Sequence, residues 1–147
     1  MSFAERVTEE EKRLATEEQV IREAIDREIL EKSGALGLLR DLECNLPIDR
    51  FLGIHMDDHR DEIDGVSHLI GRVASFVMES SDTYTGRYVE RKVKTSMAVA
   101  ANIFGYIQVW GNGKMADLTE EEWKADPSLL ESAVMKAYLN PLRSRNK

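Results

Sequence analysis

The chain has 147 residues, of which 42% are hydrophobic and 32% charged, and its formal net charge is −7. This length fits one domain with a real hydrophobic core, and the balance of residue types is that of a globular protein rather than a disordered one. An acidic surface repels phosphate groups, so nucleic acids and anionic membrane surfaces are not expected as partners.

The first expected element is a long, highly charged helix over residues 8–33. Thr8 and Glu11 have the spacing of a capping box, and Gly34 can adopt the left-handed conformation that ends a helix. Acidic residues stand four positions before basic ones, which stabilises a helix: Glu9–Arg13, Glu18–Arg22, Glu23–Arg27 and Glu28–Lys32. The apolar stripe is thin and comprises Leu14, Ile21, Ile25 and Ile29. Such a helix either lies on the surface of its own domain or pairs with another chain as an extended dimerisation helix.

The next two expected elements are a short helix over residues 33–44 and a long helical segment over residues 48–80. In the long segment, apolar residues recur at alternating steps of three and four, which is typical of a helix face: Ile63, Val66, Ile70, Val73 and Val77. The pattern leaves open whether residues 48–80 form one helix or two, with a break near Gly53 and Asp57 or Asp58 as a new N-cap.

The second half of the chain predicts another long helix over residues 82–110, followed by two short helices. Thr119 and Glu122 form a capping pattern ahead of Trp123, and Asp126 with Pro127 starts the last helix. We find no strand-like alternation of useful length. The sequence therefore predicts a single all-α domain over residues 1–147, a helical bundle built on two long central helices with the charged N-terminal helix and the short C-terminal helices around them.

One acidic stretch resembles a metal site. On a continuous helix, His55, His59 and Glu62 share a face, and Asp58 stands four residues before Glu62. Imidazole and carboxylate ligands together suit a divalent transition metal, with Asp58 as a further ligand, or with Asp58 or Asp61 orienting a ligand or acting as a general base. The alternative is a carboxylate-rich helix start in which His59 is a partly buried structural histidine.

The strongest basic cluster lies at residues 86–94. Arg87, Arg91 and Lys94 fall on one face of the expected helix, beside Tyr88. Arginine and tyrosine are common at binding hot spots, so these residues are candidates for binding a small anionic ligand or a protein partner. Internal pairing with the acidic residues 57–64 is the simpler explanation.

The capping patterns and apolar ladders favour a non-catalytic helical protein that binds or regulates a protein partner, as a homodimer. The alternatives are a metal-dependent hydrolase using His55, His59 and Glu62, and a binder of a small anionic ligand. Cys44 is the single cysteine, so no internal disulfide can form and a reducing compartment is favoured. The N-terminal residues have no signal-peptide core and no apolar run has the length of a membrane span, so we expect a cytoplasmic protein without membrane contact.

Overall fold

The computed structural model describes residues 2–45, 50–83 and 90–145, and it contains both helices and a large sheet. Its elements follow in chain order: α1 (Phe3–Ala24), the π-helix η1 (Ile25–Glu31), α2 (Ala35–Asn45), β1 (Arg50–Ile63), β2 (Val66–Thr83), β3 (Glu90–Asn102), β4 (Ile107–Gly111), β5 (Gly113–Leu118), α3 (Glu120–Ala125), α4 (Pro127–Leu139) and β6 (Leu142–Arg145).

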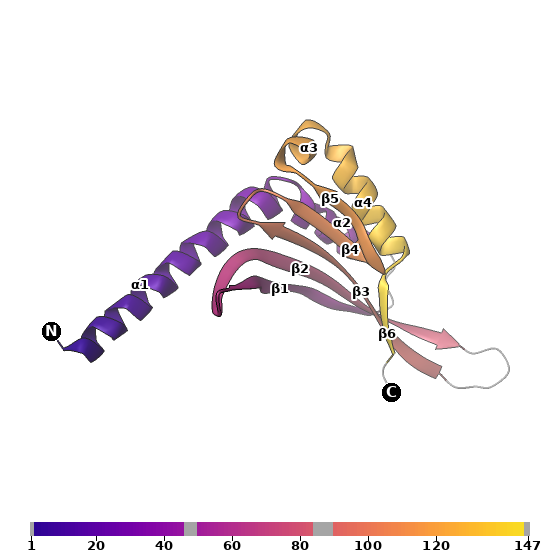
Figure 1. The fold of residues 1–147 in the computed structure, drawn as a ribbon. Helices are drawn as coiled ribbons and strands as arrows, with labels where there is room; N and C mark the ends of the chain where they lie inside the picture. The colour runs from indigo at the N-terminus through magenta and orange to yellow at the C-terminus, as the bar shows by residue number, and fades with distance from the viewer. Residues whose placement is uncertain (1, 46–49, 84–89, 146–147) are drawn as a thin grey trace.

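The six strands form one antiparallel sheet in which β1 to β5 are neighbours in chain order (Figure 1). A two-residue turn, Asp64–Gly65, joins β1 to β2 between the paired residues Ile63 and Val66. Both turn residues have positive φ angles, 51° and 77°. This is the geometry of the tight hairpin turn that suits the twist of a sheet. β6 pairs with residues 93–96 of β3, next to the segment of β3 that pairs with β4.

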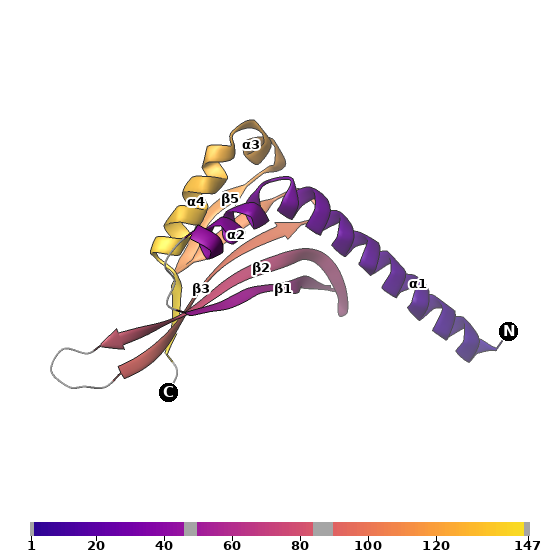
Figure 2. The same cartoon turned by 180° about the vertical axis from the view of Figure 1, so that it is seen from behind.

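The helices α2, α3 and α4 lie on one side of the sheet, as the two opposite views show (Figures 1 and 2). The C-terminal end of α1 lies over this same side. From there the helix projects away from the body of the molecule, so that the N-terminus lies at its far tip. The fold therefore has two layers, a sheet and a layer of helices from both ends of the chain, with one long helix projecting from it.

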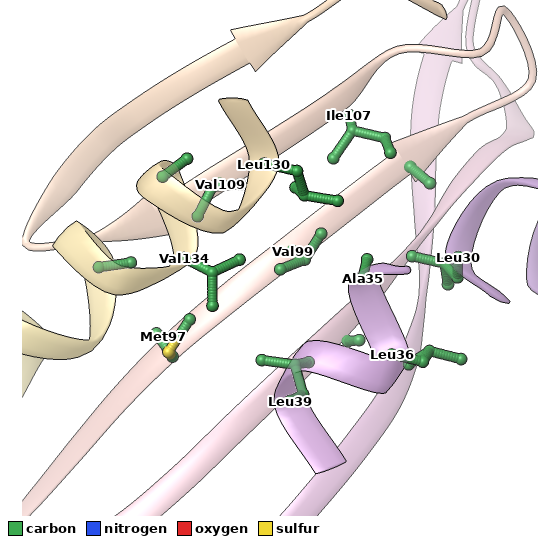
Figure 3. Packing of buried hydrophobic residues seen from close by; sticks show 14 of the residues in the cluster. Leu30, Ala35, Leu36, Leu39, Met97, Val99, Ile107, Val109, Leu130 and Val134 are labelled. Atoms are coloured by element: carbon green, nitrogen blue, oxygen red, sulfur yellow. The ribbon is translucent and has the colours of Figure 1, made fainter. Parts of the chain in front are cut away.

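The hydrophobic core lies between the sheet and these helices (Figure 3). Alternate residues of β3 and β4, such as Val99 and Val109, point toward α4, where Leu130 and Val134 meet them. Leu39 of α2 is also fully buried in this layer. The largest side chains with almost no exposed surface come from both layers: Phe76, Ile25, Leu30, Leu39, Met97, Ile107 and Leu130.

The other face of the sheet is not covered by any helix of the described residues, and we call it the open face. Its central rows carry small or β-branched side chains, which are half-buried by their neighbours alone: Val73, Ser75, Val77, Ser96, Ala98 and Ala100. Trp110 of β4 stands beside Ala98 on this face and is exposed.

The prediction of an all-α bundle with two long central helices is wrong, because residues 50–83 and 90–102 form the long strands β1, β2 and β3. The physical reason lies in the open face. A strand that buries one face and exposes the other alternates apolar and polar residues, but here both faces of β2 and β3 carry apolar or small residues. The steps of three and four among Ile63, Val66, Ile70 and Val73 arose from this nearly continuous apolar content and not from a helix face.

Several local predictions are confirmed. The N-terminal helix forms, although Ser2 caps it instead of Thr8, and Gly34 follows it with a positive φ of 87°. The capping box of Thr119 and Glu122 is present, and Trp123 is buried, with its indole Nε1 donating a hydrogen bond of 2.7 Å to the carbonyl oxygen of Gly105.

Gly71 of β2 lies where the sheet permits no side chain, and this gives a first testable prediction. A Cβ atom at Gly71 would fall far inside van der Waals distance of the Ala101 carbonyl oxygen in β3. We expect Gly71→Ala to lower the free energy of unfolding by about 1–3 kcal/mol, because the pairing of β2 with β3 must shift. Urea denaturation measures this change.

Gly37→Ala provides the matched control. Gly37 is an exposed residue of α2, and no atom lies within 4 Å of its Cβ position. The same substitution is expected to stabilise the protein there by up to about 1 kcal/mol, because alanine favours a helix over glycine. Equal effects at the two positions would contradict the close contact at Gly71.

Candidate functional site

The projecting helix α1 carries an apolar stripe that runs from the core out into solvent. At 100° per residue, five apolar side chains fall on one narrow face, which we call the α1 stripe: Phe3, Val7, Leu14, Ile21 and Ile25. Ile25 is buried and Ile21 packs against the core, whereas Leu14, Val7 and Phe3 are 49%, 40% and 75% exposed. The stripe therefore continues an internal packing surface beyond the edge of the molecule.

A cluster of six charged side chains holds α1 on the sheet. We call it the ion-pair cluster, and it joins Glu18, Arg22 and Asp26 of the helical segment to Asp58, Arg60 and Arg72 of β1 and β2.

Asp58 is the centre of this cluster. Arg22 donates to both of its carboxylate oxygens, at 3.0 Å from Nε to Oδ1 and 2.6 Å from Nη2 to Oδ2. Arg72 donates from Nη1 to Oδ1 at 2.7 Å and from Nε to Asp26 at 3.3 Å. One carboxylate thus links helix and sheet through two guanidinium groups.

Charge pairing in the cluster shifts the pKa values of its acids downward. The hydrogen bonds from Arg22, and then those from Arg72, lower the pKa of Asp58 to about 2, although its partial burial acts in the opposite direction. At the next turn of the helix, Arg60 donates to Glu18 at 2.8 Å and lowers the pKa of that carboxyl as well. Both acids are therefore charged at neutral pH and hold α1 in place.

The order of these contacts shows the path of α1 across the sheet. Asp26 contacts Arg72 of β2, Arg22 contacts Asp58 of β1, and Glu18 contacts Arg60, also of β1. Going toward the N-terminus, the helix thus moves from β2 to the edge strand β1. We call the remaining segment, residues 3–17, the overhang; it contains no buried residue, and in both views it extends past the sheet (Figures 1 and 2).

The overhang is stabilised as a helix by its own side chains. Ser2 caps the helix by accepting a hydrogen bond from the Glu5 amide, at 3.2 Å. Arg13 pairs with Glu10 and with Glu17, where the sequence had predicted Glu9 as its partner. Such pairs between neighbouring turns favour the helix, so the projecting segment has local support without tertiary contacts.

β1 is an edge strand and contacts α1 at Glu18, directly after the overhang. It is 14 residues long and pairs only with β2 among the described strands. On its open-face side, imidazole and carboxylate groups alternate at every second residue, all of them exposed: His55, Asp57, His59 and Asp61. The ring of His55 lies over Gly53, whose Cβ position is 3.5 Å from two ring atoms.

The predicted metal-binding residues are all in β1, so the helical arrangement that brought them together is wrong. In a strand, residues four apart are separated by about 13 Å, too far for His55 and His59 to share one ion directly. Asp58 points to the opposite side of the sheet and is held by Arg22 and Arg72. Within the described ranges, no group of three or more His, Cys, Asp or Glu side chains is placed so that it could hold a metal ion. A metal at His55, Asp58, His59 and Glu62 stays a prediction from the sequence.

The predicted basic binding cluster is only partly within the described residues. Arg87 and Tyr88 lie outside them, and the side chain of Arg91 is also not described. Lys94 is an exposed residue of β3, opposite Glu79 of β2. Of the acidic residues 57–64, Asp58 pairs with Arg22 of α1 and Arg72 of β2. Ligand binding by the basic cluster stays a prediction.

A surface depression of about 430 Å³ lies between η1 and α3. It is bordered by η1, by the segment after β3 and by α3, with Trp123 among its lining residues. Its charged lining contains both signs, and Lys124 pairs with Glu120. This mixture gives the depression no preference for an anion or a cation.

No protein-family model, curated protein or solved structure matches this chain. Among the helices of the described residues, none has the length and apolar content needed to cross a bilayer.

Proposed function

We propose that this chain acts by binding protein chains rather than by catalysis, and that it forms a homodimer in the cytoplasm. The observation that carries the proposal is the exposed half of the α1 stripe. Phe3, Val7 and Leu14 are aligned on one face of a helix that the chain's own fold leaves exposed. An aligned apolar face on a projecting helix is typical of a surface that packs against another protein. The lone exposed Cys44 suits a reducing compartment.

The size of the stripe is sufficient for a measurable affinity. Fully burying a valine or leucine side chain contributes about 1.5–3 kcal/mol, and about 1.4 kcal/mol changes a dissociation constant tenfold. Burying Val7 and Leu14 together could therefore lower the dissociation constant of the dimer by two or more orders of magnitude. This makes substitution on the stripe a sensitive test.

Size-exclusion chromatography with light scattering, over a range of protein concentrations, tests the proposal. We expect the intact chain to be a dimer, and Val7→Glu to raise its dissociation constant at least tenfold by placing a charge in the interface. Val7→Glu combined with Leu14→Glu should give a monomer. Circular dichroism should show that the helix content is retained, because glutamate favours a helix at least as well as valine.

Val20→Glu is the matched control, since Val20 is 60% exposed on the same helix but lies away from the α1 stripe. This variant should dimerise like the intact chain. An intact chain that stays monomeric up to millimolar concentration would contradict the homodimer. Equal effects of Val7→Glu and Val20→Glu would show that the stripe is not the binding surface.

A further inference from the structure

We infer that the second copy binds along β1, so that the two β1 strands pair antiparallel about a two-fold axis and the two sheets become one. The inference rests on the proposed homodimer and adds its binding surface and its register. It follows from three features of the described residues: the length of the exposed sheet edge, the charge pattern along that edge, and the path of α1 over it.

The first feature is the edge itself. β1 offers 14 residues of backbone on its outer side, whereas β5, at the other end of the β1 to β5 order, has six residues. An edge strand presents unpaired N–H and C=O groups that readily accept another strand. A long edge left open is the natural site for a strand of another chain, and β1 is the longest of the edge strands β1, β5 and β6 among the described residues.

The second feature is that the charges of β1 are complementary to those of an antiparallel copy. When Asp57 stands opposite the second copy's His59, four of the six cross-strand pairs on the open face join an imidazole to a carboxylate, and the other two place Gly53 opposite Ile63. The four pairs are His55 with Asp61 and Asp57 with His59, each occurring twice. Opposite-charge or hydrogen-bonding pairs directly across two antiparallel strands stabilise their pairing.

In this register the two-fold axis passes beside Asp58, and the two Asp58 residues face each other on the helix side. Two carboxylates in contact normally repel each other. Here each is already bonded to Arg22 and Arg72 of its own chain, which compensates its charge. The ion-pair cluster thus makes this register electrostatically possible.

The third feature is the direction of α1, which crosses β1 and extends past the sheet beyond this edge. The helix crosses from β2 to β1 between Asp26 and Glu18, and the overhang continues in that direction. Residues 3–17 span about 21 Å at about 1.5 Å per residue. This length is about four times the spacing of about 4.8 Å between neighbouring strands, so the overhang is long enough to cross an added strand. The exposed part of the α1 stripe, from Leu14 to Phe3, therefore lies over the added strand and has the same orientation as Ile21 and Ile25, which face the core.

Disulfide trapping tests the register directly. In a Cys44→Ser background, Asp57→Cys and His59→Cys are made as two separate proteins of different mass, mixed, and oxidised. Opposed residues on paired strands have the Cβ separation that a disulfide needs. We expect the mixed disulfide to form faster than either homodimer disulfide. Lys114→Cys and Asp117→Cys on the edge strand β5 form the control pair, which should cross-link slowly.

A charge exchange provides a second readout that does not depend on oxidation. Asp57→Lys alone and His59→Glu alone should each weaken the dimer about threefold to tenfold, and the double variant should return to within about twofold of the intact chain. A dimer that fails to cross-link at residues 57 and 59, or that shows no rescue, would overturn the β1 pairing and leave the proposed function standing. A monomer under all conditions would overturn both.

Discussion

Replacing Phe76 by alanine is expected to lower the free energy of unfolding by about 3–5 kcal/mol, the largest effect of any single substitution considered. Phe76 has no exposed surface, and its ring contacts residues of two other elements. The ring centroid lies 4.8 Å from that of Phe51 in β1 and 6.5 Å from that of Tyr138 in α4, the latter in an edge-on arrangement. Removing it leaves a cavity where β1, β2 and α4 meet.

Urea denaturation at pH 7 measures this loss. If the slope of unfolding free energy against urea concentration is the same for both proteins, the shift of the midpoint reports the change in stability. Val77→Ala is the control, because Val77 is the next residue of β2 and points to the open face, where it is half-buried. It should cost about 1 kcal/mol or less. Similar losses at positions 76 and 77 would contradict the placement of the core on the helix side only.

Asp58→Asn is expected to destabilise the chain by about 2 kcal/mol at pH 7. The substitution removes the negative charge that Arg22 and Arg72 share, at hydrogen-bond distances of 2.6 and 2.7 Å. The Asp58 side chain is 23% exposed, so the loss should be smaller than for a fully buried ion pair. The change should also loosen α1, which amide hydrogen exchange in residues 18–26 would detect.

The pH dependence provides an independent check on the same residue. The pKa of Asp58 is lowered from 3.8 to about 2 in the folded chain, so its stabilising contribution is present above pH 4. That contribution is lost as the pH falls from about 4 to about 2, because the unfolded chain then binds a proton more readily than the folded one. The difference in stability between the intact chain and Asp58→Asn should therefore shrink over this range.

The helices near both ends of the chain could be predicted from the sequence because their signals are local. Thr119 and Glu122 cap α3, Asp126 caps α4 ahead of Pro127, and Gly34 follows η1. Each of these signals depends on residues within a few positions of one another. The surrounding fold does not need to be known for such signals to act.

The sheet could not be predicted from hydrophobic periodicity, because β2 and β3 carry apolar or small side chains on both faces. Other signals were available. Asp64 and Gly65 between the β-branched residues Ile63 and Val66 are the typical sequence of a two-residue hairpin turn. The many valines and threonines of residues 66–102 also favour strands over helices.

The candidate site shows the same division between local and distant signals. The α1 stripe follows from spacing within one helix, and Leu14, Ile21 and Ile25 were identified on it from the sequence. The ion-pair cluster was missed because Arg22 and Asp58 are 36 residues apart, and the sequence offered Glu18 as a nearer partner for Arg22. Arg22 does remain 3.7 Å from Glu18, but its closer contacts are with Asp58.

The two-layer arrangement also has a consequence for folding while the chain is being synthesised. The apolar side of β3 and β4 is covered by α4, whose first residue is Pro127, while α2 covers its part of the same sheet from the other end of the chain. A growing chain therefore makes all of β1 to β5 before the helix that shields Val99 and Val109 exists. The core closes only when residues 127–139 have been synthesised, and until then the unfinished sheet presents an apolar surface to its surroundings.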